Sequence, residues 1–143
     1  MLSAVLLYIH RFFVTQMKLV RARTASASSS RTAHGNDWDS AAEEHAKKLV
    51  RRELERLRDS FEAAKRDGYE KFIMFLHYPP TSILEAESGF TEMAEEYRAE
   101  QVIYAHCHGE SRFHDSLEGE HNGIRYSLVS GDYLRWKPHL VLV

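Results

Sequence analysis

Several residue types that define other classes of protein are scarce in this sequence. Cys107 is the only cysteine among 143 residues, so neither an internal disulfide nor a cysteine-rich zinc ribbon can form. The apolar opening of the chain is interrupted by Arg11 and Lys18, too early for a membrane span. The formal charge is only −2, and no basic stripe is interleaved with aromatic residues, so nothing indicates a nucleic-acid partner. We therefore expect one cytoplasmic globular domain without a membrane span.

Acidic residues are missing from residues 1–34, which carry five basic residues and a charge of +5, so that residues 35–143 carry −7. An acid-free leader rich in arginine and serine has the composition of an organellar transit peptide. The alternative is a divergent start that does not fold with the rest of the chain, and we expect this alternative. The sequence thus predicts a poorly packed leader or linker over residues 1–35 and a folded domain over residues 36–143.

A long helix is predicted after the leader. Ser40 and Glu43 match a capping box, in which each side chain satisfies a free backbone N–H of the first turn. Gly68 is well placed to end the helix in a left-handed conformation. Residues 34–39, with Trp38 as an anchor, are interpreted as a loop before the helix. Apolar residues recur at three- and four-residue spacing along one face, namely Ala46, Leu49, Val50, Leu54, Leu57, Phe61 and Ala64.

Two continuous apolar runs, residues 71–77 and 101–106, have the length and composition of strands buried on both faces. The segment between them, residues 88–100, has the spacing of a short helix, so the two strands are predicted to be parallel neighbours. Residues 123–130 and 139–143 are rich in β-forming residues. The expected order is helix, strand, helix, strand, strand, strand, which is typical of an α/β protein.

Histidines stand where both central strands end. His77 closes the first strand and His106 the second, and His108 follows two residues later. Ligands of open α/β sheets bind beyond the carboxyl ends of the strands, and neutral imidazole is a common ligand of zinc, iron and manganese. In extended backbone His106 and His108 would point the same way and Cys107 the opposite way, so we expect Cys107 to be buried. A single zinc ion held by three histidines is one option at this edge.

Five segments of the sequence, in this order, carry a resemblance to a known family: "FLHYPP", "SGFTEMAEEY", "VIYAHCHG", "GEHNGIRYSLVSGDYL" and "KP". From about residue 36 to its end, the chain resembles the C-terminal half of the calcineurin-like metallophosphoesterases, most closely a bacterial phosphohydrolase branch. The resemblance implies half of an αββα sandwich and a centre of two divalent metal ions, zinc, manganese or iron. It also implies that His77 and His106 serve one metal and His108 the other.

Other motifs of that superfamily do not occur in this sequence. D-x-H, G-D-x-x-D and G-N-H-[DE] supply the bridging carboxylate and the remaining ligands, and Ala105 replaces the glycine of G-H-x-H. Two neighbouring cations need anionic bridging ligands to coexist. We therefore expect a metal-dependent phosphoester hydrolase that lacks its N-terminal ligand motifs, with weak metal binding and negligible activity alone. The alternative is a non-catalytic half-domain that needs a missing N-terminal partner.

Three further residues belong to segments that follow the histidines. Arg112 is a candidate to pair with a substrate phosphate if its loop folds over the site. Asp132 and Tyr133 belong to the "SGDYL" segment and are expected to be structural.

Overall fold

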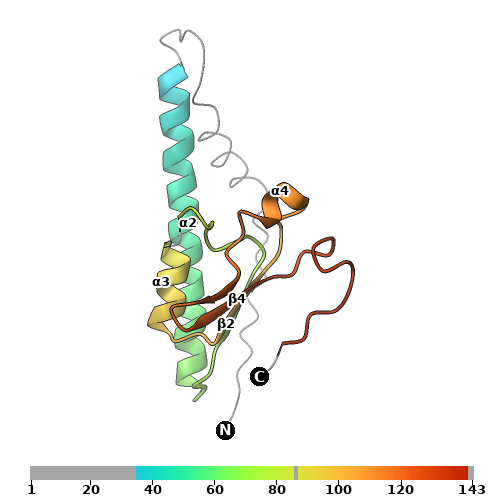
Figure 1. Ribbon diagram of the computed structural model, residues 1–143. Coiled ribbons are helices and arrows are strands. Elements are labelled where there is room, and N and C mark those ends of the chain that lie inside the picture. Colours follow the sequence, from blue (N-terminus) through green and yellow to red (C-terminus); the bar gives the residue numbers. More distant parts are fainter. Residues whose placement is uncertain (1–34, 86, 142–143) are drawn as a thin grey trace. The chain divides into compact units, whose positions relative to one another are not determined.

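The computed structural model describes residues 35–85 and 87–141, and the predicted leader lies almost wholly outside them. The described residues form two compact units, one ending at Arg56 and the other starting at Leu57. Figure 1 shows the elements in chain order. They are α2 (Gly35–Arg66), β1 (Ile73–Leu76), α3 (Gly89–Glu96), β2 (Gln101–Tyr104), α4 (Glu110–Phe113), β3 (Gly119–His121) and β4 (Ile124–Leu128).

Helix α2 ends as the sequence predicts but begins earlier. Gly68 has a φ of +86° and donates to the Lys65 carbonyl, while the Tyr69 N–H bonds to the Ala64 carbonyl. This pair of bonds is the Schellman motif, which requires a left-handed residue and so favours glycine. The predicted start was wrong, because the helix begins at Gly35 and places Ser40 in its interior. No proline stands between Gly35 and Ser40, so no residue of this stretch breaks the helix.

The helices of the described region are amphipathic or short. Among residues 35–85 and 87–141, none has the combination of length and apolar character that a membrane crossing needs.

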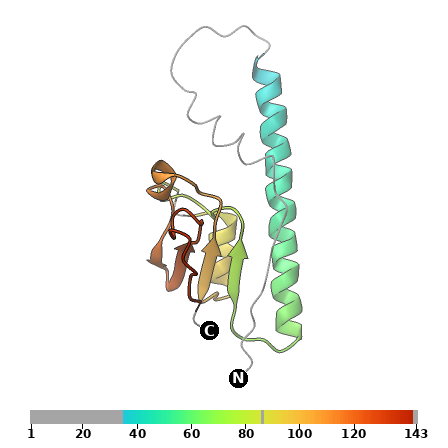
Figure 2. The same cartoon turned by 90° about the vertical axis from the view of Figure 1, so that its right-hand side faces the viewer.

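The sheet has four strands in the order β1-β2-β4-β3. β1 pairs with β2 and β2 with β4, both in parallel, while β3 is antiparallel to β4. The predicted parallel neighbours, joined by a helix, are therefore confirmed as β1, α3 and β2. Figure 2 shows β1 and β2 side by side with α3 behind them.

The last part of the sheet differs from the prediction. Strand β4 was expected, but its hairpin partner β3 was not, since β3 has only three exposed residues. The turn between them is Asn122-Gly123, both with positive φ, as the tightest hairpin turns require. The predicted strand over residues 139–143 was wrong for 139–141, which are irregular, and residues 142–143 lie outside the described range. Pro138 precedes this segment and has no N–H to donate to a ladder.

One face of the sheet forms the core beneath the helices. Met74, Val102 and Tyr126 lie in register across β1, β2 and β4, and none is more than 3% exposed. Phe61 of α2 is fully buried, stacks on Tyr97 and contacts Phe72 edge-on. The last part of the predicted apolar stripe, around Phe61, thus packs against Phe72 and Tyr97.

We predict that Phe61→Ala lowers the free energy of unfolding by about 3–5 kcal/mol, because it removes a buried ring and leaves a cavity. Urea unfolding followed by circular dichroism measures this change. Leu84→Ala is the control, because Leu84 is 85% exposed and its truncation should cost less than about 0.5 kcal/mol. Equal effects of the two substitutions would contradict this packing.

Candidate metal site

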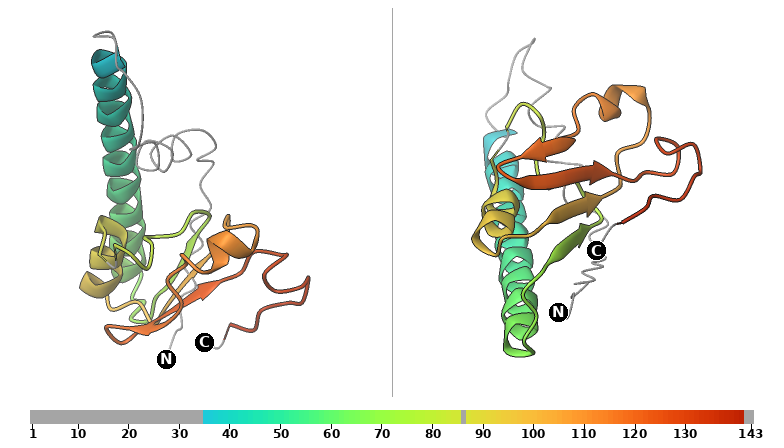
Figure 3. Two further views of the ribbon diagram at one scale, coloured as in Figure 1. Left: turned by 45° about the horizontal axis from the view of Figure 1, so that its top comes forward. Right: turned by 60° about the horizontal axis from the view of Figure 1, so that its bottom comes forward.

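The candidate site lies at the carboxyl ends of the parallel strands. Figure 3 shows the arrowheads of β2 and β4 pointing to the side where α4 lies. The ladder continues past the strands, because the Ala105 N–H donates to the His77 carbonyl at 3.2 Å and the Val129 N–H to the Tyr104 carbonyl at 2.7 Å. The parallel pairing therefore holds the segments that follow β1 and β2 next to each other.

His77 and His106 are brought together at this edge. His106 Nδ1 lies 3.3 Å from His77 Nε2, so that one ring donates a hydrogen bond to the other. The Tyr78 ring lies against both imidazoles, with ring centroids 4.7 Å from His77 and 4.2 Å from His106. Two nitrogen atoms bound to one tetrahedral zinc ion lie about 3.3–3.4 Å apart, given bonds of about 2.0–2.1 Å. The observed separation of the two ring nitrogens matches this spacing.

The backbone at His106 differs from the extended conformation that the sequence suggested. His106 has a φ of +67°, and the Cys107 N–H donates to the Ala105 carbonyl at 2.8 Å, which closes a tight γ-turn around it. A γ-turn with positive φ is rare and strained for a residue with a side chain. The predicted extended backbone, in which His106 and His108 would point the same way, was therefore wrong. Cys107 is 8% exposed, as predicted.

His108 has a different partner. Its Nδ1 lies 2.9 Å from Asp132 Oδ1, and the Gly109 N–H donates to Asp132 Oδ2 at 3.0 Å. The Tyr133 N–H also bonds to Asp132 Oδ1. The two carboxylate oxygens of Asp132 thus hold the segment after His106 in place, while His108 Nε2 makes no hydrogen bond within the described residues.

Local electrostatics favour a neutral His106. Burial lowers the pKa of His106 below its ordinary value, and the nearby charges of His77 and Arg112 lower this pKa further. Neutral imidazole is the form that binds metals. Desolvation alone would raise the pKa of Asp132, but hydrogen bonds from the Gly109 N–H and His108 outweigh it and hold this pKa below its usual range.

The three predicted ligands do not form one cluster. Within residues 35–85 and 87–141, no group of three histidine, cysteine or carboxylate side chains is arranged to hold a metal ion. His77 and His106 are hydrogen-bonded to each other, and His108 is paired with Asp132. A complete coordination shell would need further ligands.

Two residues of the site were not found by the sequence reasoning. Tyr78 covers the histidine pair, and its position directly after His77 was the available signal. Asp132 was treated as structural, although it follows β4 by four residues and so stands at the same edge as the histidines. A carboxylate shortly after β4, at the same sheet edge as the histidines, could have indicated a partner for His108.

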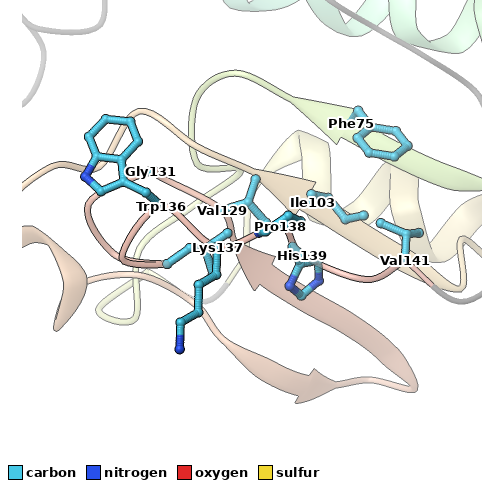
Figure 4. Close-up of a pocket in the computed structure, with 10 residues that line it drawn as sticks. Phe75, Ile103, Val129, Gly131, Trp136, Lys137, Pro138, His139 and Val141 are labelled. Atoms are coloured by element: carbon cyan, nitrogen blue, oxygen red, sulfur yellow. The ribbon is translucent and has the colours of Figure 1, made fainter.

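An apolar groove opens on the other face of the sheet. It has a volume of about 500 Å³ and is lined by strand residues and by the segment after β4. Figure 4 shows Phe75, Ile103 and Val129 along it, with Lys137 and Trp136 from the following segment. The Trp136 ring lies against Gly131 at the groove and is nevertheless 84% exposed.

No known family, curated protein or solved structure matches this chain.

The strained turn predicts an unusual order of stability at position 106. His106→Gly should be more stable than His106→Ala by about 1 kcal/mol, because glycine adopts positive φ without a steric penalty. Asp59, exposed within α2, is the control position, where alanine should be more stable than glycine by a similar amount. Urea unfolding of the four variants measures both differences. The same order at both positions would contradict the positive φ of His106.

The lowered pKa of His106 also predicts a pH dependence. The unfolded chain takes up this proton first as the pH falls, so the stability from neutral His106 is complete above about pH 6.5 and is lost below it. His106→Asn keeps a residue that tolerates positive φ but cannot titrate. Between about pH 8 and pH 5.5 the wild type should lose more stability than His106→Asn in urea unfolding. Equal losses would contradict a lowered pKa.

Proposed function

We propose that this chain supplies the histidine-bearing part of a metal-dependent phosphoester hydrolase of the calcineurin-like metallophosphoesterase type. The observation that carries this proposal is the pair His77 Nε2 and His106 Nδ1, 3.3 Å apart at the carboxyl ends of adjacent parallel strands. The motif order that resembles the family supports it independently. In this proposal His77 and His106 hold one divalent ion, and His108 faces a second through its Nε2.

The residues around the pair would serve binding and orientation. Tyr78 lies against both imidazoles and packs one side of the pair. Arg112 is exposed and near enough to lower the pKa of His106, so it is placed to attract the phosphoryl oxygens of a substrate. Divalent ions in such a centre would polarise the phosphoester and provide a hydroxide nucleophile at neutral pH.

A second feature supports the view that the site is completed by another polypeptide segment. Bridging carboxylates are needed between two cations, and no such cluster exists in the part of the chain that the structure describes. The apolar groove of Phe75, Ile103 and Val129 lies on the sheet face opposite the core. Sheets of parallel strands are normally covered on both faces. An N-terminal half-domain packed there would both cover the groove and bring the missing carboxylates.

Zinc and manganese titrations of the full chain test the proposal. We expect weak binding by calorimetry and negligible hydrolysis of an aryl phosphate, because the histidines lack anionic co-ligands. His106→Ala should abolish binding at the His77–His106 pair, and His108→Ala should abolish binding of the second ion. His45→Ala is the matched control, because His45 is an exposed histidine of α2 and its loss should leave the affinity unchanged.

Two results would contradict the proposal, each in its own way. Efficient metal-dependent turnover by this chain alone would contradict the need for a second segment. Metal affinity that survives both histidine substitutions would contradict the site itself. Complete absence of metal binding by the wild type would favour the alternative, a non-catalytic half-domain.

A further inference from the structure

We infer that Asp132 is a positioning residue for His108: its carboxylate fixes the imidazole with the proton on Nδ1 and leaves Nε2 free to bind a ligand. This role rests on the proposed function, because a free Nε2 at this edge is useful at a metal ion or a phosphoryl group. It goes beyond that proposal by assigning a function to a residue outside the histidine motif.

The geometry around Asp132 supports this role. Its Oδ1 lies 2.9 Å from His108 Nδ1, and its Oδ2 accepts the Gly109 N–H at 3.0 Å. An aspartate side chain is ionised at neutral pH and only accepts hydrogen bonds, so the proton of this contact belongs to His108 Nδ1. Nε2 is then the unprotonated nitrogen of the neutral ring.

The same carboxylate also fixes the backbone on which His108 stands. Gly109 has a φ of +86°, so the chain turns sharply directly after His108. The bond from the Gly109 N–H to Asp132 orients this turn, and the Asp132 carbonyl in turn accepts the Arg135 N–H at 3.1 Å. Asp132 is therefore held within its own turn while it holds the histidine segment. Carboxylates that orient a histidine in this way typically change metal affinity by about 10–100-fold when removed.

The variant Asp132→Asn distinguishes a role in positioning His108 from a role in packing alone. Asp132→Asn keeps the size of the side chain but replaces one acceptor oxygen with an NH₂ donor. With its oxygen on the Gly109 N–H, the amide presents its NH₂ group to His108 Nδ1 and to the Tyr133 N–H. With its oxygen turned toward His108, it leaves the Gly109 N–H without this acceptor. Either orientation weakens the preference for the proton on Nδ1. Asp132→Glu restores a carboxylate and should restore part of the original tautomer population.

The experiment is long-range ¹H–¹⁵N NMR of the histidine rings in the full chain, without metal and above the ordinary histidine pKa of about 6.5. The wild type should show His108 protonated on Nδ1, and Asp132→Asn should shift it toward Nε2. Zinc affinity, measured by calorimetry in parallel, should fall by about 10–100-fold in Asp132→Asn. Asp115→Asn makes the same charge change at an exposed position and should alter neither result.

The outcomes separate this inference from the proposed function. A wild-type His108 protonated on Nε2 would overturn the positioning role, and this measurement needs no variant. A tautomer that is the same in Asp132→Ala, which removes both acceptor oxygens, would also overturn it. A tautomer that responds to Asp132 in a chain that binds no zinc would support the positioning role and contradict the metal site.

Discussion

The parallel pairing of β1 with β2 is the constraint on which the candidate site depends. It aligns Leu76 with Tyr104 and carries the ladder on to the bond between the Ala105 N–H and the His77 carbonyl. Without this register, histidines 29 residues apart in the sequence would not share a hydrogen bond. The burial of Met74 and Val102 under the helices stabilises this register, since a slip by one residue would turn both toward the opposite face.

A strained backbone turn, and the contacts that hold it, lie directly after β2. His106 occupies a γ-turn with positive φ, a conformation that costs energy and persists only where the surroundings impose it. Two contacts hold this turn. The side chain of Cys107 is buried on one side, and the Gly109 N–H donates to the Asp132 carboxylate on the other. Strained residues of this kind cluster at ligand sites, which is consistent with the proposal for the histidine pair. The site is thus built from a rigid sheet edge and a turn held by a distant carboxylate.

The sequence predicts the parts of the fold that depend on long apolar patterns. The runs around Met74 and Val102, and the end of α2 at Gly68, were predicted because burial and a left-handed cap leave strong local signals. Strand β3 was not predicted, since three exposed residues form a strand only through their pairing with β4. In the site, the meeting of His77 and His106 followed from strand order. The positive φ of His106 and the contact with Asp132 did not, because both depend on a turn whose geometry is set by tertiary contacts.

In the proposed function, the sheet edge presents a pair of imidazole nitrogens spaced for one divalent ion. The most direct measurement is anomalous X-ray diffraction at the zinc absorption edge, on crystals of the full chain grown with zinc. We expect an anomalous peak about 2.0–2.1 Å from both His77 Nε2 and His106 Nδ1. Zinc bound at other residues, with these two nitrogens still hydrogen-bonded to each other, would contradict it.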